Sequence, residues 1–148
     1  MTSPAITTQD FGARMSMELS FQRDPASTPH HLTPEDAVWP RRLRWVVRGV
    51  LGQGAQARVV GDAETLVSEL VTNALRHGGG DIRFRMRVRG GRVLIEVRDG
   101  SSVVPRVRHA SVEDEHGRGL VLVDALADEW GVSADGTTIW CALPLPAP

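Results

Sequence analysis

The stretch from Glu64 to His77, ETLVSELVTNALRH, predicts an amphipathic helix of about four turns, around which the rest of the chain is organised. Asp62 is the expected N-cap of this helix. Apolar residues recur along it at helical spacing and form one wide stripe: Leu66, Val67, Leu70, Val71, Ala74 and Leu75. The stripe predicts that one side of the helix packs against a hydrophobic core.

Three polar residues follow one edge of that stripe. Glu69, Asn73 and His77 stand at positions i, i+4 and i+8, so at about 100° per residue they form a row along the helix. A carboxylate, a carboxamide and an imidazole would therefore line the border between core and solvent, where a ligand can lie. A plain polar helix edge is the simpler interpretation of these three residues taken alone.

Composition bounds the class of protein. The 148 residues are enough for one domain with a real core, and the net charge of −1 gives no overall sign of nucleic-acid or membrane binding. All 17 basic residues are arginines, which excludes a phosphate-loop lysine or a Schiff-base lysine. The single cysteine, Cys141, suits a reducing compartment, and no apolar run approaches the ~20 residues of a membrane span. We expect a cytoplasmic protein.

The first third of the chain predicts a strand followed by helices. We expect residues 1–13 to be a flexible N-terminus and residues 14–148 to form a single domain. Alternation from Arg14 to Arg23 predicts a half-buried strand. Thr33 is the expected cap of the next helix, which Pro40 interrupts or restarts before it ends at Leu51.

The helix that ends at Leu51 has an apolar face and an arginine face. The arginines are Arg41, Arg42, Arg44 and Arg48. Such a face is usually solvated, and a protein-docking surface is the alternative. Residues 52–61 are expected to form a loop that leads into the Glu64 helix.

The clearest strands form a hairpin after three glycines, Gly78 to Gly80. Ile82, Phe84, Met86 and Val88 alternate with arginines, Gly90-Gly91 forms the turn, and the return strand runs from Arg92 to Asp99. Asp99 ends the inward-facing row of that strand, where an unpaired carboxylate would be costly. The strand arginines favour a solvated sheet face over a nucleic-acid stripe, because no aromatic residues are interleaved with them.

The last third predicts a lid, a helix and two strands. Residues 100–116 form a long segment with little apolar period, which is typical of a functional loop. Gly117-Arg118-Gly119-Leu120 is expected to open a helix whose N–H groups suit phosphate oxygens. Two strands follow, from Trp130 to Ser133 and from Thr137 to Leu143. This order predicts an α+β two-layer sandwich, with helices on one face of a mostly antiparallel mixed sheet.

Three segments together resemble one known family. Residues 69–77, residues 99–101 and residues 117–120 are similar, in this order, to the N, G1 and G2 boxes of the GHKL (Bergerat-fold, histidine-kinase-type) ATPases. Within that superfamily the chain looks like the stand-alone anti-sigma-factor serine/threonine kinases of the RsbW type, particularly small actinobacterial members. The resemblance extends from Arg14 to Leu143 and implies that residues 14–148 are one ATP-binding domain.

The resemblance implies a role for each matching residue of the first two boxes. Glu69 would be the catalytic general base, Asn73 would coordinate Mg²⁺ at the ATP phosphates, and His77 would lie near the nucleotide. Asp99 would accept a hydrogen bond from the adenine amino group. Ser101 stands where the family's G1 box usually has glycine.

The remaining implied contacts lie further along the chain. Residues 117–120 (Gly117, Arg118, Gly119 and Leu120) would hold the phosphates through backbone N–H groups, under a lid formed by residues 100–116. Thr137 matches the family's threonine near the adenine pocket.

The implied cofactors are ATP and Mg²⁺, and the implied activity is a serine/threonine protein kinase. It would phosphorylate an antagonist protein of the STAS type and sequester a sigma factor, with no direct nucleic-acid or membrane partner. The alternative is a nucleotide-gated partner-switch protein without significant kinase activity. Members of the family commonly form homodimers.

Overall fold

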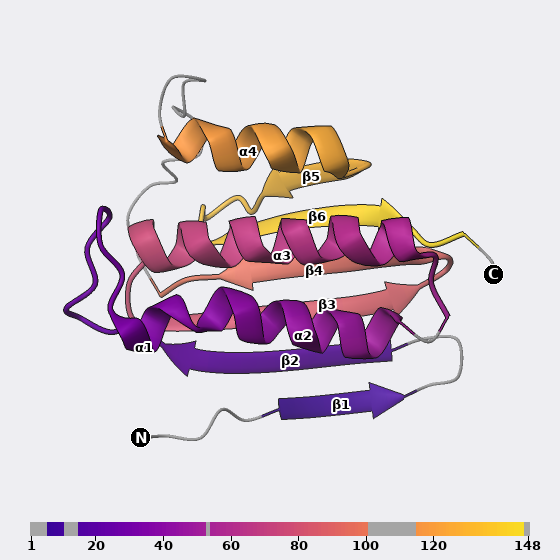
Figure 1. Ribbon diagram of the computed structural model, residues 1–148, viewed down its shortest axis with the longest axis horizontal. Helices are drawn as coiled ribbons and strands as arrows, with labels where there is room; N and C mark the ends of the chain where they lie inside the picture. Colours follow the sequence, from indigo (N-terminus) through magenta and orange to yellow (C-terminus); the bar gives the residue numbers. More distant parts are fainter. Residues whose placement is uncertain (1–5, 11–14, 53, 101–114, 147–148) are drawn as a thin grey trace.

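The chain folds into the expected α+β two-layer sandwich, with helices on one face of a single sheet (Figure 1). The computed structural model describes residues 6–10, 15–52, 54–100 and 115–146. The expected lid therefore lies almost wholly outside the described residues, and so does Ser101.

The sheet has six strands in the order β1-β2-β3-β4-β6-β5. Their bounds are Ile6–Asp10 for β1, Met15–Gln22 for β2, Asp81–Arg89 for β3, Arg92–Arg98 for β4, Glu129–Val132 for β5 and Thr138–Pro144 for β6. Every neighbouring pair of these strands is antiparallel, so the expectation of a mixed sheet was wrong. The reason is visible in Figure 1: the two long helices between β2 and β3 run in opposite directions, so the chain enters β3 antiparallel to β2.

The described residues also form four helices: α1 (Pro34–Ala37), α2 (Trp39–Leu51), α3 (Ala57–His77) and α4 (Glu115–Leu126). Thr33 is the N-cap of α1, as expected, and its side chain accepts a hydrogen bond from the Asp36 N–H. The helix restarts at Trp39, with Pro40 in its first turn. None of the helices among the described residues is long and apolar enough to cross a membrane.

The N-terminal part of α3 corrects one expectation. The helix begins at Ala57, capped by Gln56, and not at Asp62. Gly61 lies inside it, although glycine costs a helix about 1 kcal/mol relative to alanine. Burial of Ala63 and partial burial of Val60 against the core offset that cost, which local sequence preference does not include.

The N-terminus corrects another expectation. Residues 1–13 were expected to be flexible, but Ile6–Asp10 forms β1 and pairs with β2 in a register that places Ile6 opposite Leu19. Without β1, the backbone N–H and C=O groups along one side of β2 would lack partners in the sheet. An edge strand gains these hydrogen bonds without needing an alternating apolar pattern, so its sequence gave little signal.

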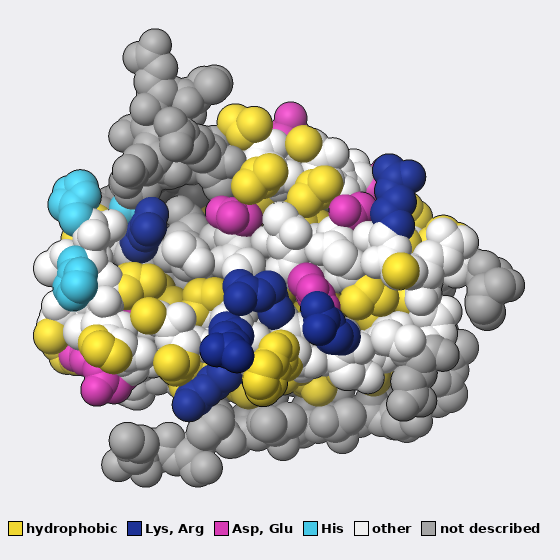
Figure 2. Space-filling view, in the orientation of Figure 1, with side chains coloured by type: hydrophobic (Ala, Val, Ile, Leu, Met, Phe, Trp, Pro, Cys, Tyr) yellow, Lys and Arg dark blue, Asp and Glu magenta, His cyan; other side chains and the backbone are white. Residues whose placement is uncertain are grey.

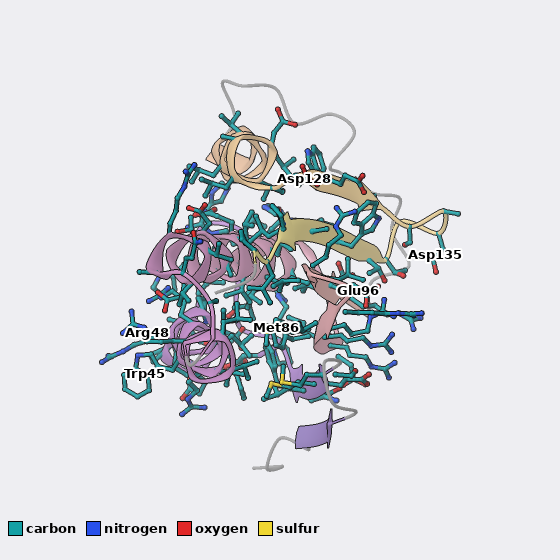
Figure 3. The ribbon with its side chains drawn as sticks, turned by 90° about the vertical axis from the view of Figure 1, so that its right-hand side faces the viewer. Trp45, Arg48, Met86, Glu96, Asp128 and Asp135 are labelled. Carbon is teal, nitrogen blue, oxygen red and sulfur yellow. The ribbon has the colours of Figure 1, made fainter. Side chains whose placement is uncertain are left out.

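The core lies between α2, α3 and the inner face of the sheet. The expected stripe of α3 is confirmed, since each of its six apolar residues is at most 5% exposed. The inward rows of the hairpin are buried as predicted: Ile82, Phe84, Met86, Val93, Ile95 and Val97. Figure 3 shows Met86 on the inner side of the sheet, toward the helices. Cys141 is also buried, and burial raises the pKa of its thiol to about 12.

We expect Leu70→Ala to lower the free energy of unfolding by about 2–5 kcal/mol, because it leaves a cavity between α3 and the sheet. Urea unfolding followed by circular dichroism measures the loss. Val121→Ala is the control, since Val121 is 48% exposed on α4 and its truncation should change stability by less than about 0.5 kcal/mol. Equal losses in the two variants would contradict this assignment of the core.

Candidate functional site

The polar edge of α3 is present as the spacing predicts. Glu69, Asn73 and His77 are half-buried, while the apolar residues beside them are fully buried. Each polar residue lies one turn from the next, about 6 Å along the helix axis. The packed stripe prevents α3 from rotating, so these side chains are held at the border of the core and remain accessible from solvent.

The last turn of α3 meets the end of β4 at a glycine. A Cβ atom built on Gly78 would lie 2.5 Å from the Asp99 Cβ and 2.8 Å from its Cγ, so only glycine fits at this position. The half-buried Asp99 side chain therefore lies directly against the backbone that ends α3. The two motifs that carry Glu69 and Asp99 form one wall.

Backbone hydrogen bonds hold this junction together. Gly100 N–H donates to the Gly79 carbonyl at 2.7 Å, and Asp99 N–H donates to the Thr137 carbonyl at 3.1 Å. Gly100 also needs to be glycine, since a Cβ there would lie 2.8 Å from the Gly79 oxygen. Asp99 is thus positioned by α3 on one side and by the start of β6 on the other.

The charge at the end of α3 is favourable for a hydrogen-bond donor. A helix C-terminus carries partial negative charge, and Asp99 adds a carboxylate beside it. Arg23 supplies part of the compensation, because its Nε donates to the Leu75 carbonyl and its backbone N–H donates to the Gly80 carbonyl. No sequence pattern pointed to Arg23, which follows β2 and reaches α3 only in the folded chain.

Thr137 lies close to Asp99, but it comes just before the last strand, whereas the sequence predicted that it begins that strand. It precedes β6, and its N–H and hydroxyl donate to Asp135 Oδ1 at 3.1 and 2.8 Å. The same carboxylate oxygen accepts from the Ser133 hydroxyl at 2.6 Å. These hydrogen bonds, with that from Ser133 the largest, lower the pKa of Asp135 to about 2. No sequence pattern singled out Asp135, although aspartate before glycine often makes such local bonds.

The glycine-rich segment expected to open a helix lies inside one. The helix α4 begins at Glu115, so Gly117, Arg118, Gly119 and Leu120 belong to its first turns. Leu120 is half-buried, while the side-chain environments of residues 115–119 lie outside the described part of the structure. Val123 is fully buried and α4 packs beside α3, so the start of α4 belongs to the same layer as the polar edge.

Comparison with known proteins agrees with this architecture. The chain matches the histidine kinase-like ATPase domain family over residues 34–143. It is also similar to a solved histidine kinase domain from the Erythrobacter litoralis EL346 blue-light activated histidine kinase, with 24% identity and a TM-score of 0.51. That match covers 77% of this chain and 62% of the solved chain, and it supports the fold. No match was found among curated proteins.

The chain belongs to the histidine kinase-like ATPase family, and residues 34–143 form its ATP-binding domain. The strands β1 and β2 lie outside that match and extend the sheet on one side. The fold class and the histidine kinase-like ATPase family expected from the sequence are therefore confirmed.

The residues present fit a magnesium ion held mainly by phosphate. Glu69 and Asn73 offer carboxylate and amide oxygens, which are hard ligands suited to Mg²⁺. The described residues contain no cluster of three or more histidine, cysteine, aspartate or glutamate side chains that could hold a metal. Mg²⁺ bound with ATP needs no such cluster, because phosphate oxygens and waters supply most of its ligands.

We expect Gly78→Ala to weaken ATP binding about tenfold or more, because the new Cβ forces Asp99 from its position. Titration calorimetry with ATP measures the change. Gly79→Ala is the matched control, since a Cβ there meets nothing within 4 Å. If the two variants bind ATP equally well, the contact between Gly78 and Asp99 does not position the nucleotide.

Proposed function

We propose that the protein is an Mg-ATP-dependent serine/threonine kinase that phosphorylates an antagonist of the STAS type and sequesters a sigma factor. The observation that carries the proposal is the placement of Glu69 one turn before Asn73 on the half-buried edge of α3. The contact of that helix with Asp99 adds a recognition group for the nucleotide to the same wall.

Each residue of this wall has a distinct role in the proposal. Asp99 accepts a hydrogen bond from the adenine amino group, and the negative end of α3 strengthens its preference for a donor. Asn73 would hold Mg²⁺ through its amide oxygen, and the free N–H groups in the first turn of α4, which includes Gly117, would bind phosphate oxygens. His77, Ser101 and Thr137 border the nucleotide.

Glu69 is the group that distinguishes a kinase from a binding protein. Its carboxylate takes the proton of the attacking serine or threonine hydroxyl as that oxygen bonds to the γ-phosphorus and ADP leaves. Bound Mg-ATP supplies the phosphoryl group. The chain contributes mainly position and charge, which is how phosphoryl-transfer enzymes act.

The outer face of α2 supplies a surface for protein partners. Trp45 is 61% exposed there, and the Arg41 guanidinium lies 5.1 Å from the centre of its ring. Figure 3 shows Trp45 and Arg48 pointing away from the sheet, and Figure 2 shows arginines gathered over this helix. Tryptophan and arginine dominate the binding energy of many interfaces, which supports the docking interpretation of this face.

We expect Asp99→Asn to weaken ATP binding about ten- to a hundredfold, since a hydrogen bond to a charged group contributes roughly 1.5–3 kcal/mol. Calorimetry with and without Mg²⁺ measures the adenine contact separately from the metal contribution. Asp128→Asn removes the same charge from an exposed carboxylate that pairs with Arg92 at 3.1 Å, and it should bind ATP normally. Unchanged affinity in Asp99→Asn would remove the adenine contact from the proposal.

We expect Glu69→Gln to retain ATP affinity but to lose at least about a hundredfold in phosphate transfer to a STAS-type protein encoded beside it, since the amide cannot accept a proton. Radiolabelled phosphate transfer measures the rate. Glu129→Gln is the control, because Glu129 lies on β5, away from α2, and its exposed carboxylate pairs with Arg92 at 3.5 Å. A wild-type protein that binds ATP but transfers no phosphate to this partner would favour the partner-switch alternative.

A further inference from the structure

The face of the sheet opposite the helices carries a ladder of charged residues. Figure 3 shows Glu96 on this face, directed away from Trp45, Arg48 and the helices. Glu18 on β2 pairs with Arg83 at 3.2 Å and with Arg85 at 3.0 Å, and Glu96 on β4 pairs with Arg87 at 3.3 Å and with Arg85 at 3.7 Å. Two carboxylates thus balance part of the positive charge contributed by β3.

Arg98 breaks the pattern of the ladder. It stands directly opposite Arg83 in the register of β3 and β4, and like charges in this arrangement destabilise a sheet. Within the part of the chain that the structure describes, no carboxylate lies within ion-pair distance of Arg98, although its charge helps to lower the pKa of Asp135. Three other arginines of this face (Arg83, Arg85 and Arg87) share only two carboxylates, Glu18 and Glu96.

Three arginines of this face line a hollow of about 170 Å³ on the sheet surface. Its walls are Arg83, Arg85, Glu96, Arg98 and Thr138. Thr138 lies opposite Arg98 in the register of β4 and β6, so a hydroxyl faces the two guanidinium groups of Arg83 and Arg98. The Glu96 carboxylate in the wall is already engaged by Arg85 and Arg87.

We propose that this hollow is a binding site for a small anion of the phosphate class. The guanidinium groups of Arg83 and Arg98 donate to its oxygens, as arginine forks do to phosphate, and the Thr138 hydroxyl donates a further hydrogen bond. The anion relieves the repulsion between the two opposed arginines. A hollow of this volume is large enough for a phosphate-sized ion.

The proposed anion site lies back to back with the nucleotide site. Arg98 and Asp99 are adjacent in sequence, as are Thr137 and Thr138, and successive side chains of a strand point to opposite faces. Asp99 faces α3, whereas Arg98 lines the hollow on the other face of the sheet. The two sites are therefore separate and share the ends of β4 and β6.

The test is a nitrogen-15 NMR titration of the full chain with inorganic phosphate, at constant ionic strength maintained with chloride. We expect saturable shifts at the backbone amides of Arg98 and Thr138 and at the Arg83 Nε–H. Arg98→Gln should weaken binding about tenfold, because one charged donor is lost. Thr138→Val, which keeps the shape and removes the hydroxyl, should weaken it about threefold.

The matched control is Arg89→Gln. Arg89 lies on β3, like Arg83, and points to the same face of the sheet. It stands at the hairpin turn, away from the hollow, so the affinity for phosphate should not change. Shifts that rise linearly without saturation, or an affinity equal in wild type and Arg98→Gln, would overturn the proposal. It would equally be overturned if the shifts appeared only along α3 and the start of α4, because the anion would then occupy the nucleotide site alone.

Discussion

The burial of one side of α3 is the constraint on which the rest of the molecule depends. Leu66, Leu70 and Leu75 are excluded from solvent, and each such side chain contributes roughly 1.5–3 kcal/mol by its burial. Any rotation of the helix would expose them, so a single orientation is favoured. Glu69 and Asn73 stay at the solvent-accessible border of the core because the opposite side of their helix cannot leave it.

The second constraint is the close approach between Gly78 and Asp99. A carboxylate at the end of the apolar row of β4 is placed beside helix backbone, where no larger residue than glycine fits. Hydrogen bonds from Asp99 and Gly100 to Thr137 and Gly79 then join three segments that lie far apart in the sequence. This junction turns separate motifs into one surface of defined geometry.

The sequence predicted the elements that carry a periodic apolar pattern and failed where that pattern is absent. The alternating apolar patterns correctly predicted β2, β3 and β4, because each of these strands has one side in the core. The strand β1 gave no such pattern, and the glycines before Asp62 concealed the first turns of α3. Glu69, Asn73 and Asp99 could be selected from spacing, whereas the contact with Gly78 and the roles of Arg23 and Asp135 arise only from tertiary pairing.

The helix α3 carries both the buried stripe of the core and the polar edge, so ligand binding at that edge would be linked to the stability of the fold. A ligand that binds only the folded chain stabilises it by mass action, by about 2.7 kcal/mol when its free concentration is a hundred times its dissociation constant. The helix α3 is also the centre of the core, so unfolding the core would dismantle a ligand site on its polar edge at the same time. A nucleotide bound there would therefore raise the abundance of the folded protein, since only the unfolded fraction is open to proteolysis.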